Sequence, residues 1–252
     1  MQDAALVLSL VIFLPAAGAL ALAFFPREKE ESVRLFSLAV TIAVFLITAW
    51  MAIPGTGDNP QFHIEPTGAV QSVVVAKWIP ALGVEYFLGV DGISFPLVIL
   101  TSFLSVLSMW ASWSITKHVK GFCILFLLLE TGMLGVFLAL DFFLFFVFWE
   151  VMLLPMYFLI GVWGGPRREY AAFKFFLYTM LGGVCMVVAI VMLYFASDLG
   201  ELSTEQLEAA HVQDPDGVMS KKWLAAAGGE SDNRQHTFNI LALQQMGQHT
   251  KL

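Results

Sequence analysis

Charged residues are scarce in this sequence. Aspartate, glutamate, lysine and arginine make up 13% of the 252 residues, whereas soluble domains carry about 25%. The sequence has no basic patch interleaved with aromatic residues, which is the pattern that nucleic-acid binding requires. The net charge of −7 therefore points to no polyanionic partner, and we expect none.

Residues that hold metals and cofactors are also sparse. The two cysteines, Cys123 and Cys185, have no cysteine or histidine at metal-ligand spacing, and we interpret both as small apolar packing residues. The five histidines form no HxxxH or HExxH pair, no GxGxxG follows a predicted strand, and there is no P-loop. We therefore expect the chain itself to bind no metal, nucleotide, flavin, haem or iron–sulfur cofactor.

Long apolar runs dominate instead. Hydrophobic residues make up 58% of the chain and the mean hydropathy is +0.78. A run of about 20 apolar residues spans a membrane, and in lipid it must be helical because every backbone group needs an internal partner. We predict an all-α polytopic membrane protein with six transmembrane helices in residues 1–197 and a polar, acidic tail in residues 198–252. The predicted spans are residues 4–25, 33–53, 93–113, 122–140, 142–163 and 172–197.

The distribution of lysine and arginine predicts the orientation. The loops after the first, third and fifth spans hold basic residues, whereas the alternate loops hold only Lys77. Basic loops prefer the cytoplasmic side. We therefore expect the N-terminus and the C-terminal tail on the outer side.

Two segments outside the spans have local patterns. Residues 84–90 alternate in the period of a strand, so a short hairpin and an irregular loop are equally consistent with residues 54–92. In the tail, the spacing of Ser203 and Gln206 predicts a capping box before a short helix over 204–212, and DPDG predicts a turn at 214–217.

Glu150 is the one charged residue in the apolar run 142–165. At a rise of 1.5 Å per residue, Glu150 lies roughly 14 Å from Asp141 along its helix. Glu130, on the preceding helix, lies roughly 16 Å from Asp141, so the two carboxyls have similar depths. Intramembrane carboxyls usually face a helix bundle or a water-filled path. We therefore predict that the two carboxyls lie close together and relay protons, although each could instead make only a structural hydrogen bond.

Neighbouring residues support a polar site near Glu150. Pro155 cannot donate to the carbonyl of Val151, so the helical ladder opens beside the carboxyl. Gly161 lies on the same helical face and allows a neighbouring helix to approach. Lys174, the third intramembrane charge, is either a cationic stop in a proton path or a side chain that extends to the interface.

Three stretches carry a family resemblance: LLLETGMLGVFLALDFFLFFVFWEVMLLPMYFLIGVWGG at 127–165, FKFFLYT at 173–179 and LGVDGISFPLVILT at 88–101. Together they resemble the antiporter-like membrane subunits of the proton-pumping NADH:quinone oxidoreductase (complex I), in particular the subunit M (chain 4) family. The resemblance covers residues 1 to about 197. It implies an all-helical fold of roughly fourteen spans with two inverted repeats, of the kind seen in secondary transporters.

The resemblance also implies roles for the three intramembrane charges. Glu150 matches the essential intramembrane glutamate of the family, and Glu130 and Lys174 match charged positions along its first half-channel. The family continues into a broken helix that carries a lysine, and then into a second repeat, neither of which is in this sequence. We therefore expect an N-terminal fragment, the product of a split gene or a degenerate copy.

The function that this resemblance implies is that of a non-redox membrane subunit of a respiratory proton pump in a bacterial inner membrane. Its partners would be other membrane subunits, and the wider complex would use NADH and quinone. The isolated chain is expected to be inactive. One alternative is a subunit of a multi-subunit cation/proton antiporter, and a second is a truncated, non-conducting scaffold.

Overall fold

The computed structural model describes residues 2–26, 28–53, 70–79, 82–212 and 236–249. Six of its helices are long and apolar enough to cross a membrane, which confirms the predicted all-α membrane fold. Their bounds differ by a few residues from the predicted spans. The six helices are α1 (Gln2–Ala23), α2 (Glu30–Met51), α3 (Ser94–Ala111), α4 (Val119–Leu138), α5 (Phe142–Trp163) and α6 (Arg168–Ala196).

Two compact units make up the chain. The first comprises Met1–Val74, Leu88–Leu138 and Val147–Gly182, and the second comprises Val75–Phe87, Ala139–Phe146 and Gly183–Leu252. This division differs from the sequence-based boundary at residue 197, because segments on both sides of that boundary pack together in the second unit.

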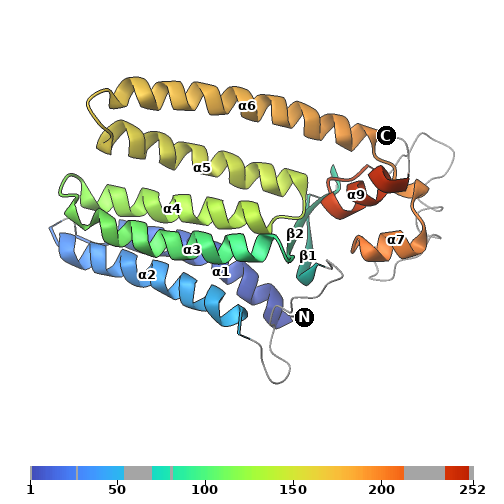
Figure 1. The fold of residues 1–252 in the computed structure, drawn as a ribbon, viewed down its shortest axis with the longest axis horizontal. Coiled ribbons are helices and arrows are strands. Elements are labelled where there is room, and N and C mark those ends of the chain that lie inside the picture. The colour runs from blue at the N-terminus through green and yellow to red at the C-terminus, as the bar shows by residue number, and fades with distance from the viewer. Residues whose placement is uncertain (1, 27, 54–69, 80–81, 213–235, 250–252) are drawn as a thin grey trace. The chain divides into compact units, whose positions relative to one another are not determined.

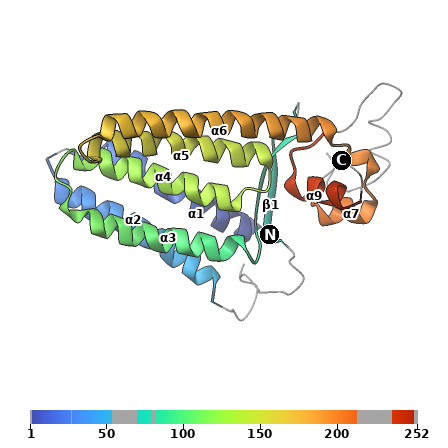
Figure 2. The same ribbon diagram turned by 45° about the horizontal axis from the view of Figure 1, so that its top comes forward.

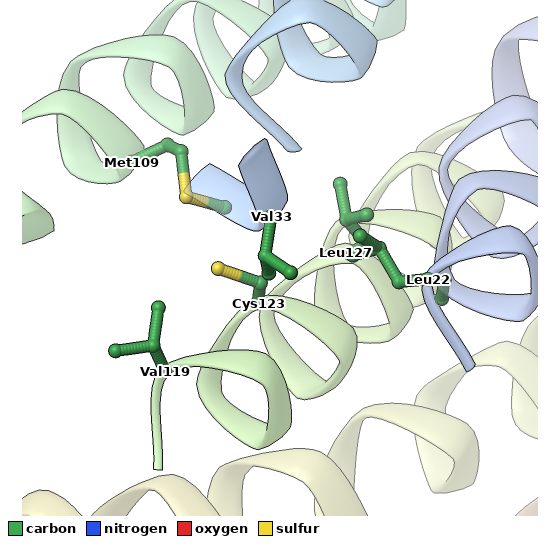
Figure 3. Packing of buried hydrophobic residues seen from close by; sticks show 7 residues of the cluster. Leu22, Val33, Met109, Val119, Cys123 and Leu127 are labelled. Carbon is green, nitrogen blue, oxygen red and sulfur yellow. The ribbon is translucent and has the colours of Figure 1, made fainter. Parts of the chain in front are cut away.

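Helices α1 to α4 form a bundle in the first unit, in which α1 packs on α4 and α2 packs on α3 (Figure 1). A cluster of buried apolar residues fills the bundle at the end where α4 begins (Figure 3). Cys123 is one of its members, in agreement with its interpretation as a packing residue, whereas Cys185 of α6 is exposed. The buried residues of the cluster are Ala19, Leu22, Val33, Met109, Val119, Cys123 and Leu127.

Glycines allow α5 to approach α4. A Cβ atom added at Gly135 would meet the ring of Phe148, and one added at Gly132 would meet the side chain of Met152. Close approach over small residues is the usual mode of helix packing in membranes, where lipid provides no hydrophobic drive between helices. The face of α5 that carries Phe148 and Met152 is therefore its contact face for α4.

Helix α6 packs on a different face of α5. The Tyr157 and Phe176 rings meet edge to face, with centroids 5.5 Å apart. A Cβ atom at Gly161 would lie 3.5 Å from the Cβ of Ala172, which is ordinary van der Waals contact. This is the close approach that Gly161 predicted from the sequence.

Basic and aromatic side chains tie the helix ends together at the loops that are rich in lysine and arginine. Lys120 Nζ donates to the carbonyls of Ala23 and Phe25, both at 2.9 Å. Arg34 Nη2 donates to the carbonyl of Ile115 at 2.6 Å. Cations near helix C-termini satisfy carbonyls that have no partner within the helix. The basic residues that predicted orientation therefore also stabilise the loops.

The two patterns outside the spans are now resolved. Strands β1 (Gln71–Ile79) and β2 (Val84–Val90) form a two-stranded sheet, so the hairpin is the correct alternative (Figure 1; Figure 2 shows β1 in a second view). The capping box of Ser203 and Gln206 is confirmed, at the start of a helix that ends earlier than predicted, α7 (Thr204–Ala209). The predicted turn at 214–217 lies outside the described residues.

Residues 139–141 connect three segments of the second unit. The N–H of Leu140 donates to Phe87 O of β2, and the carbonyl of Leu140 accepts from the N–H of Ile240, both at 2.9 Å. Asp141 and Asn239 form an antiparallel bridge. The short link between α4 and α5 therefore acts as a strand between β2 and the C-terminal segment.

The described part of the C-terminal segment is folded. Asn239 caps α9 (Ile240–His249) by accepting from the N–H groups of Leu241 and Ala242, and its amide donates to Ala210 O. Apolar residues of α7 and α9 form a shared core. The C-terminal segment therefore packs into an apolar core despite its polar composition.

Candidate functional site

Glu150 lies on the side of α5 that faces α6. A helix turns by about 100° per residue, so side chains seven and eleven positions apart share one face. Glu150 thus shares its face with Tyr157 and Gly161, the residues that contact Phe176 and Ala172 of α6. Its side chain is partly buried.

Thr179 adds a polar group to the same interface. It lies about two turns beyond Ala172, on the face of α6 that meets α5. Its hydroxyl donates to the Phe175 carbonyl at 2.7 Å within α6, so its oxygen remains able to accept a hydrogen bond. The α5–α6 interface therefore combines a carboxyl, a phenol and a hydroxyl.

Glu130 lies in a different environment, inside the bundle of α1 to α4. Its side chain is 0% exposed. The Ser105 side chain of α3 lies against the carboxyl. The pair does not meet hydrogen-bond geometry, and neither carboxyl oxygen nor Ser105 Oγ has a hydrogen-bond partner among the described residues.

The structure does not bring Glu130 and Glu150 together. On α5, Glu150 points roughly 160° away from Phe148 and Met152, which contact α4. On α4, Glu130 points roughly 160° away from Gly132, which receives Met152. Glu150 therefore points away from α4, and Glu130 points away from α5. The prediction that they lie close together was based only on their similar depths.

Lys174 is separate from both carboxyls. It is exposed on α6, and its ammonium lies 5.8 Å from the centroid of the Tyr170 ring, a cation–π contact. It lines a cavity of about 720 Å³ together with Gly164, Arg167 and Tyr178. The position fits the alternative that Lys174 extends toward the membrane interface.

A carboxyl pair outside the spans was not predicted. Asp141 is 0% exposed, and its carboxyl accepts from the N–H groups of Phe143 and Leu144 at the start of α5 and of Glu85 in β2. Burial, and then the nearby Asp141 carboxylate, raise the pKa of Glu85 to about 7, which Lys77 opposes. Burial also raises the pKa of Asp141. The position of Asp141 before an apolar run was the signal available in the sequence.

The Glu85–Asp141 pair predicts a pH dependence of the second unit. The pKa of Glu85 is raised from 4.5 to about 7 on folding, so its ionised form opposes folding. Its contribution is fully present below pH 4.5 and is lost as the pH rises through about 7. Amide exchange protection of β2, corrected for intrinsic rates, should therefore fall between pH 5 and 8, and Glu85→Gln should flatten this fall. An unchanged pH dependence in Glu85→Gln would contradict this assignment.

No group of three or more histidine, cysteine, aspartate or glutamate side chains that could hold a metal ion is present among the described residues. Carboxyl side chains lie at two places within the helices, Glu130 and Glu150, and at one place beyond them, the Glu85–Asp141 pair.

Two families of known proteins match segments of this chain. The family described as NADH:quinone oxidoreductase/Mrp antiporter, TM, matches residues 139–243. The family described as NADH-ubiquinone oxidoreductase chain 4, amino terminus, matches residues 69–141. The chain belongs to the antiporter-like membrane subunits. The match also continues beyond residue 197, where the resemblance found in the sequence ends, and includes Asn239 and the start of α9.

Individual antiporter-like subunits resemble most of this chain. NADH-quinone oxidoreductase subunit M of Rhodobacter capsulatus is 41% identical over 201 residues, which are 78% of this chain and 37% of that protein. In respiratory complex I from Thermus thermophilus, a chain of 23% identity has a TM-score of 0.61 over 76% of this chain and 36% of its own length. In the Mrp complex from Dietzia sp., a chain of 24% identity has a TM-score of 0.55, covering 76% of this chain and 19% of its own. This chain thus spans little more than a third of subunit M.

Proposed function

We propose that this antiporter-like subunit works in a respiratory NADH:quinone oxidoreductase, where it contributes an intramembrane carboxyl to proton translocation. It has no redox centre of its own, and NADH and quinone are used by other parts of the complex. The observation that carries the proposal is Glu150, the one carboxyl side chain in an apolar helix, partly buried at the α5–α6 interface.

The surroundings of Glu150 suit a group that gains and releases a proton. Tyr157 and Thr179 supply polar atoms at the same interface, and Pro155 leaves the Val151 carbonyl without its helical donor. An ionisable residue within a membrane helix marks an ion or proton path by default. Glu130 and Lys174 remain candidates for the same path, but from separate positions.

The NADH-linked assignment is favoured over the antiporter alternative by residues 69–141. That segment matches the amino terminus of NADH-ubiquinone oxidoreductase chain 4, and the relatives named above include subunit M. A subunit of a multi-subunit cation/proton antiporter is the second candidate, because residues 139–243 match a family common to both and the Mrp complex has a similar fold.

Purification from the native membrane distinguishes the two candidates. An affinity tag on this chain should recover other membrane subunits, including adjacent antiporter-like ones, together with NADH:quinone oxidoreductase activity. Recovery with small antiporter subunits and without that activity would support the antiporter alternative. Recovery of the chain without partners would support the third candidate, a non-conducting scaffold.

The proposed orientation, with both termini on the outer side, predicts a labelling pattern. Cysteines introduced at Thr116 and Gly165, both exposed in basic loops, should be protected from a membrane-impermeant thiol reagent added outside. A cysteine at Glu208, exposed on α7, should react. Gly165 tolerates the change because an added Cβ meets nothing within 4 Å. The reverse pattern would overturn the orientation and the direction of the proton path.

A further inference from the structure

A cavity of about 720 Å³ lies where the end of α5 meets the start of α6, and we call it the loop-end cavity. These two helix ends lie side by side and are joined by a short loop (Figure 1). The residues that line the cavity come from this loop, from the last turn of α5 and from one face of α6. Most of the lining surface is apolar. A ligand that fills this cavity must therefore have a large apolar part.

The loop-end cavity extends along α6 for the depth of one lipid leaflet. Its lining includes Arg167 in the loop and continues through Ala171 and Phe175 to Tyr178. At 1.5 Å per residue, the distance from Arg167 to Tyr178 along the helix is roughly 16 Å. The hydrocarbon core of a bilayer is about 30 Å thick, so one leaflet contributes about 15 Å. The cavity therefore has the length that an acyl chain of one leaflet needs.

Two cationic side chains lie at the mouth of the loop-end cavity. Arg167 is in the loop itself. Lys174 begins deeper, but its ammonium lies 5.8 Å from the ring centroid of Tyr170, one turn nearer the loop, so its side chain extends back toward the mouth. In the part of the chain that the structure describes, neither cation forms an ion pair with a carboxylate. Both charges are therefore available to a ligand.

The charges around the cavity favour an anionic ligand over a zwitterionic one. None of the residues that line it is acidic, and the neighbouring Glu169 is exposed and is not among them. A zwitterionic head group would place its own ammonium beside cations, without a carboxylate to pair with. A phosphate accepts charge-assisted hydrogen bonds from both guanidinium and ammonium groups. Basic pockets at the ends of membrane helices bind anionic head groups in this way.

We propose that the loop-end cavity binds one anionic phospholipid. Its phosphate is held by Arg167 and Lys174, and its acyl chain lies against Phe175 and Tyr178. A free phosphate would leave the apolar depth of the cavity uncovered, whereas a phospholipid satisfies both the cations and the apolar lining. The inference goes beyond the proposed function, because it assigns a ligand to the α5–α6 loop and does not depend on Glu150.

Photocrosslinking in the assembled membrane complex tests this site. The complex is reconstituted in phosphatidylcholine vesicles that contain a trace of phosphatidylglycerol with a photoreactive group on its acyl chain. A phosphatidylcholine probe with the same chain is used in parallel, and the labelled peptides are mapped by mass spectrometry. Each cation near a membrane surface favours an anionic lipid about fivefold. The phosphatidylglycerol probe should therefore label residues 171–178 about 25-fold more than the phosphatidylcholine probe.

Substitutions separate recognition of the head group from recognition of the chain. Arg167→Gln should lower labelling by phosphatidylglycerol about fivefold and leave labelling by phosphatidylcholine unchanged. Ala171→Leu, which fills part of the cavity, should lower labelling by both probes. Both residues are exposed, so neither change removes buried packing. Lys117→Gln is the matched control, because Lys117 is an exposed cation in another basic loop and does not line the cavity.

Four results would overturn the proposal. They are equal labelling by the two probes, no effect of Arg167→Gln, an equal effect of Lys117→Gln, and loss of labelling when inorganic phosphate is added at constant ionic strength. A photoreactive residue placed at Tyr178 should likewise crosslink to lipid, and a crosslink to another protein subunit instead would show that protein fills the cavity. No pumping activity is measured, so failure of this site leaves the proposed function standing, and failure of the proposed function leaves this site standing.

Discussion

We expect Glu150→Gln to abolish proton translocation, or to reduce it by roughly 100-fold or more, the contribution typical of a positioned proton-transfer group. Glutamine fills the same volume at the α5–α6 interface but cannot titrate. The amount of assembled complex should therefore be unchanged. The measurement is proton uptake by vesicles, normalised to the assembled complex.

Two further variants make this result specific. Glu150→Asp still titrates and should keep part of the activity, because its carboxyl is displaced by only one methylene. Glu169→Gln is a matched control on the exposed surface of α6 and should leave pumping unchanged. A normal rate in Glu150→Gln with normal assembly would make the carboxyl a packing group.

The second large effect is expected from Asp141→Ala. This carboxyl accepts from Phe143 N at 2.9 Å, Leu144 N at 3.0 Å and Glu85 N at 3.2 Å. Losing an N-cap and leaving buried N–H groups without an acceptor should lower the free energy of unfolding by about 2–4 kcal/mol. Thermal unfolding and the yield of folded protein in the membrane measure this loss.

Asp91 provides the control for Asp141. Its carboxyl also accepts from backbone N–H groups before a helix, those of Ile93 and Ser94, but it is only partly buried. Asp91→Ala should cost about 1 kcal/mol, as expected for a single cap in contact with water. Equal losses of unfolding free energy in the two variants would show that the burial of Asp141 adds nothing to its contribution to stability.

The membrane helices were predictable because the backbone of an apolar segment in lipid must satisfy its own hydrogen bonds. An apolar run such as 142–163 must be a helix, and the structure has α5 at those bounds. The alternation at Val84–Val90 is too short to distinguish a hairpin from an irregular loop. Its contact with Ala139–Asp141 depends on a partner more than 50 residues away, which local patterns do not encode.

The candidate site was only partly predictable for a similar reason. Counting residues gives the depth of Glu130 and Glu150 but not the direction in which each points. That direction follows from which face of α5 meets α4, and Gly135 and Phe148 determine this face through side-chain packing. The sequence therefore identified the carboxyls and could not separate their two environments.

Infrared difference spectroscopy during turnover tests the central claim, that the Glu150 carboxyl takes up and releases a proton. The account predicts a protonated-carboxyl band that changes when the intact complex oxidises NADH, is absent in Glu150→Gln, and returns at a shifted frequency in Glu150→Asp. A turnover spectrum in which Glu150→Gln is identical to the wild type, at equal assembly, would contradict it.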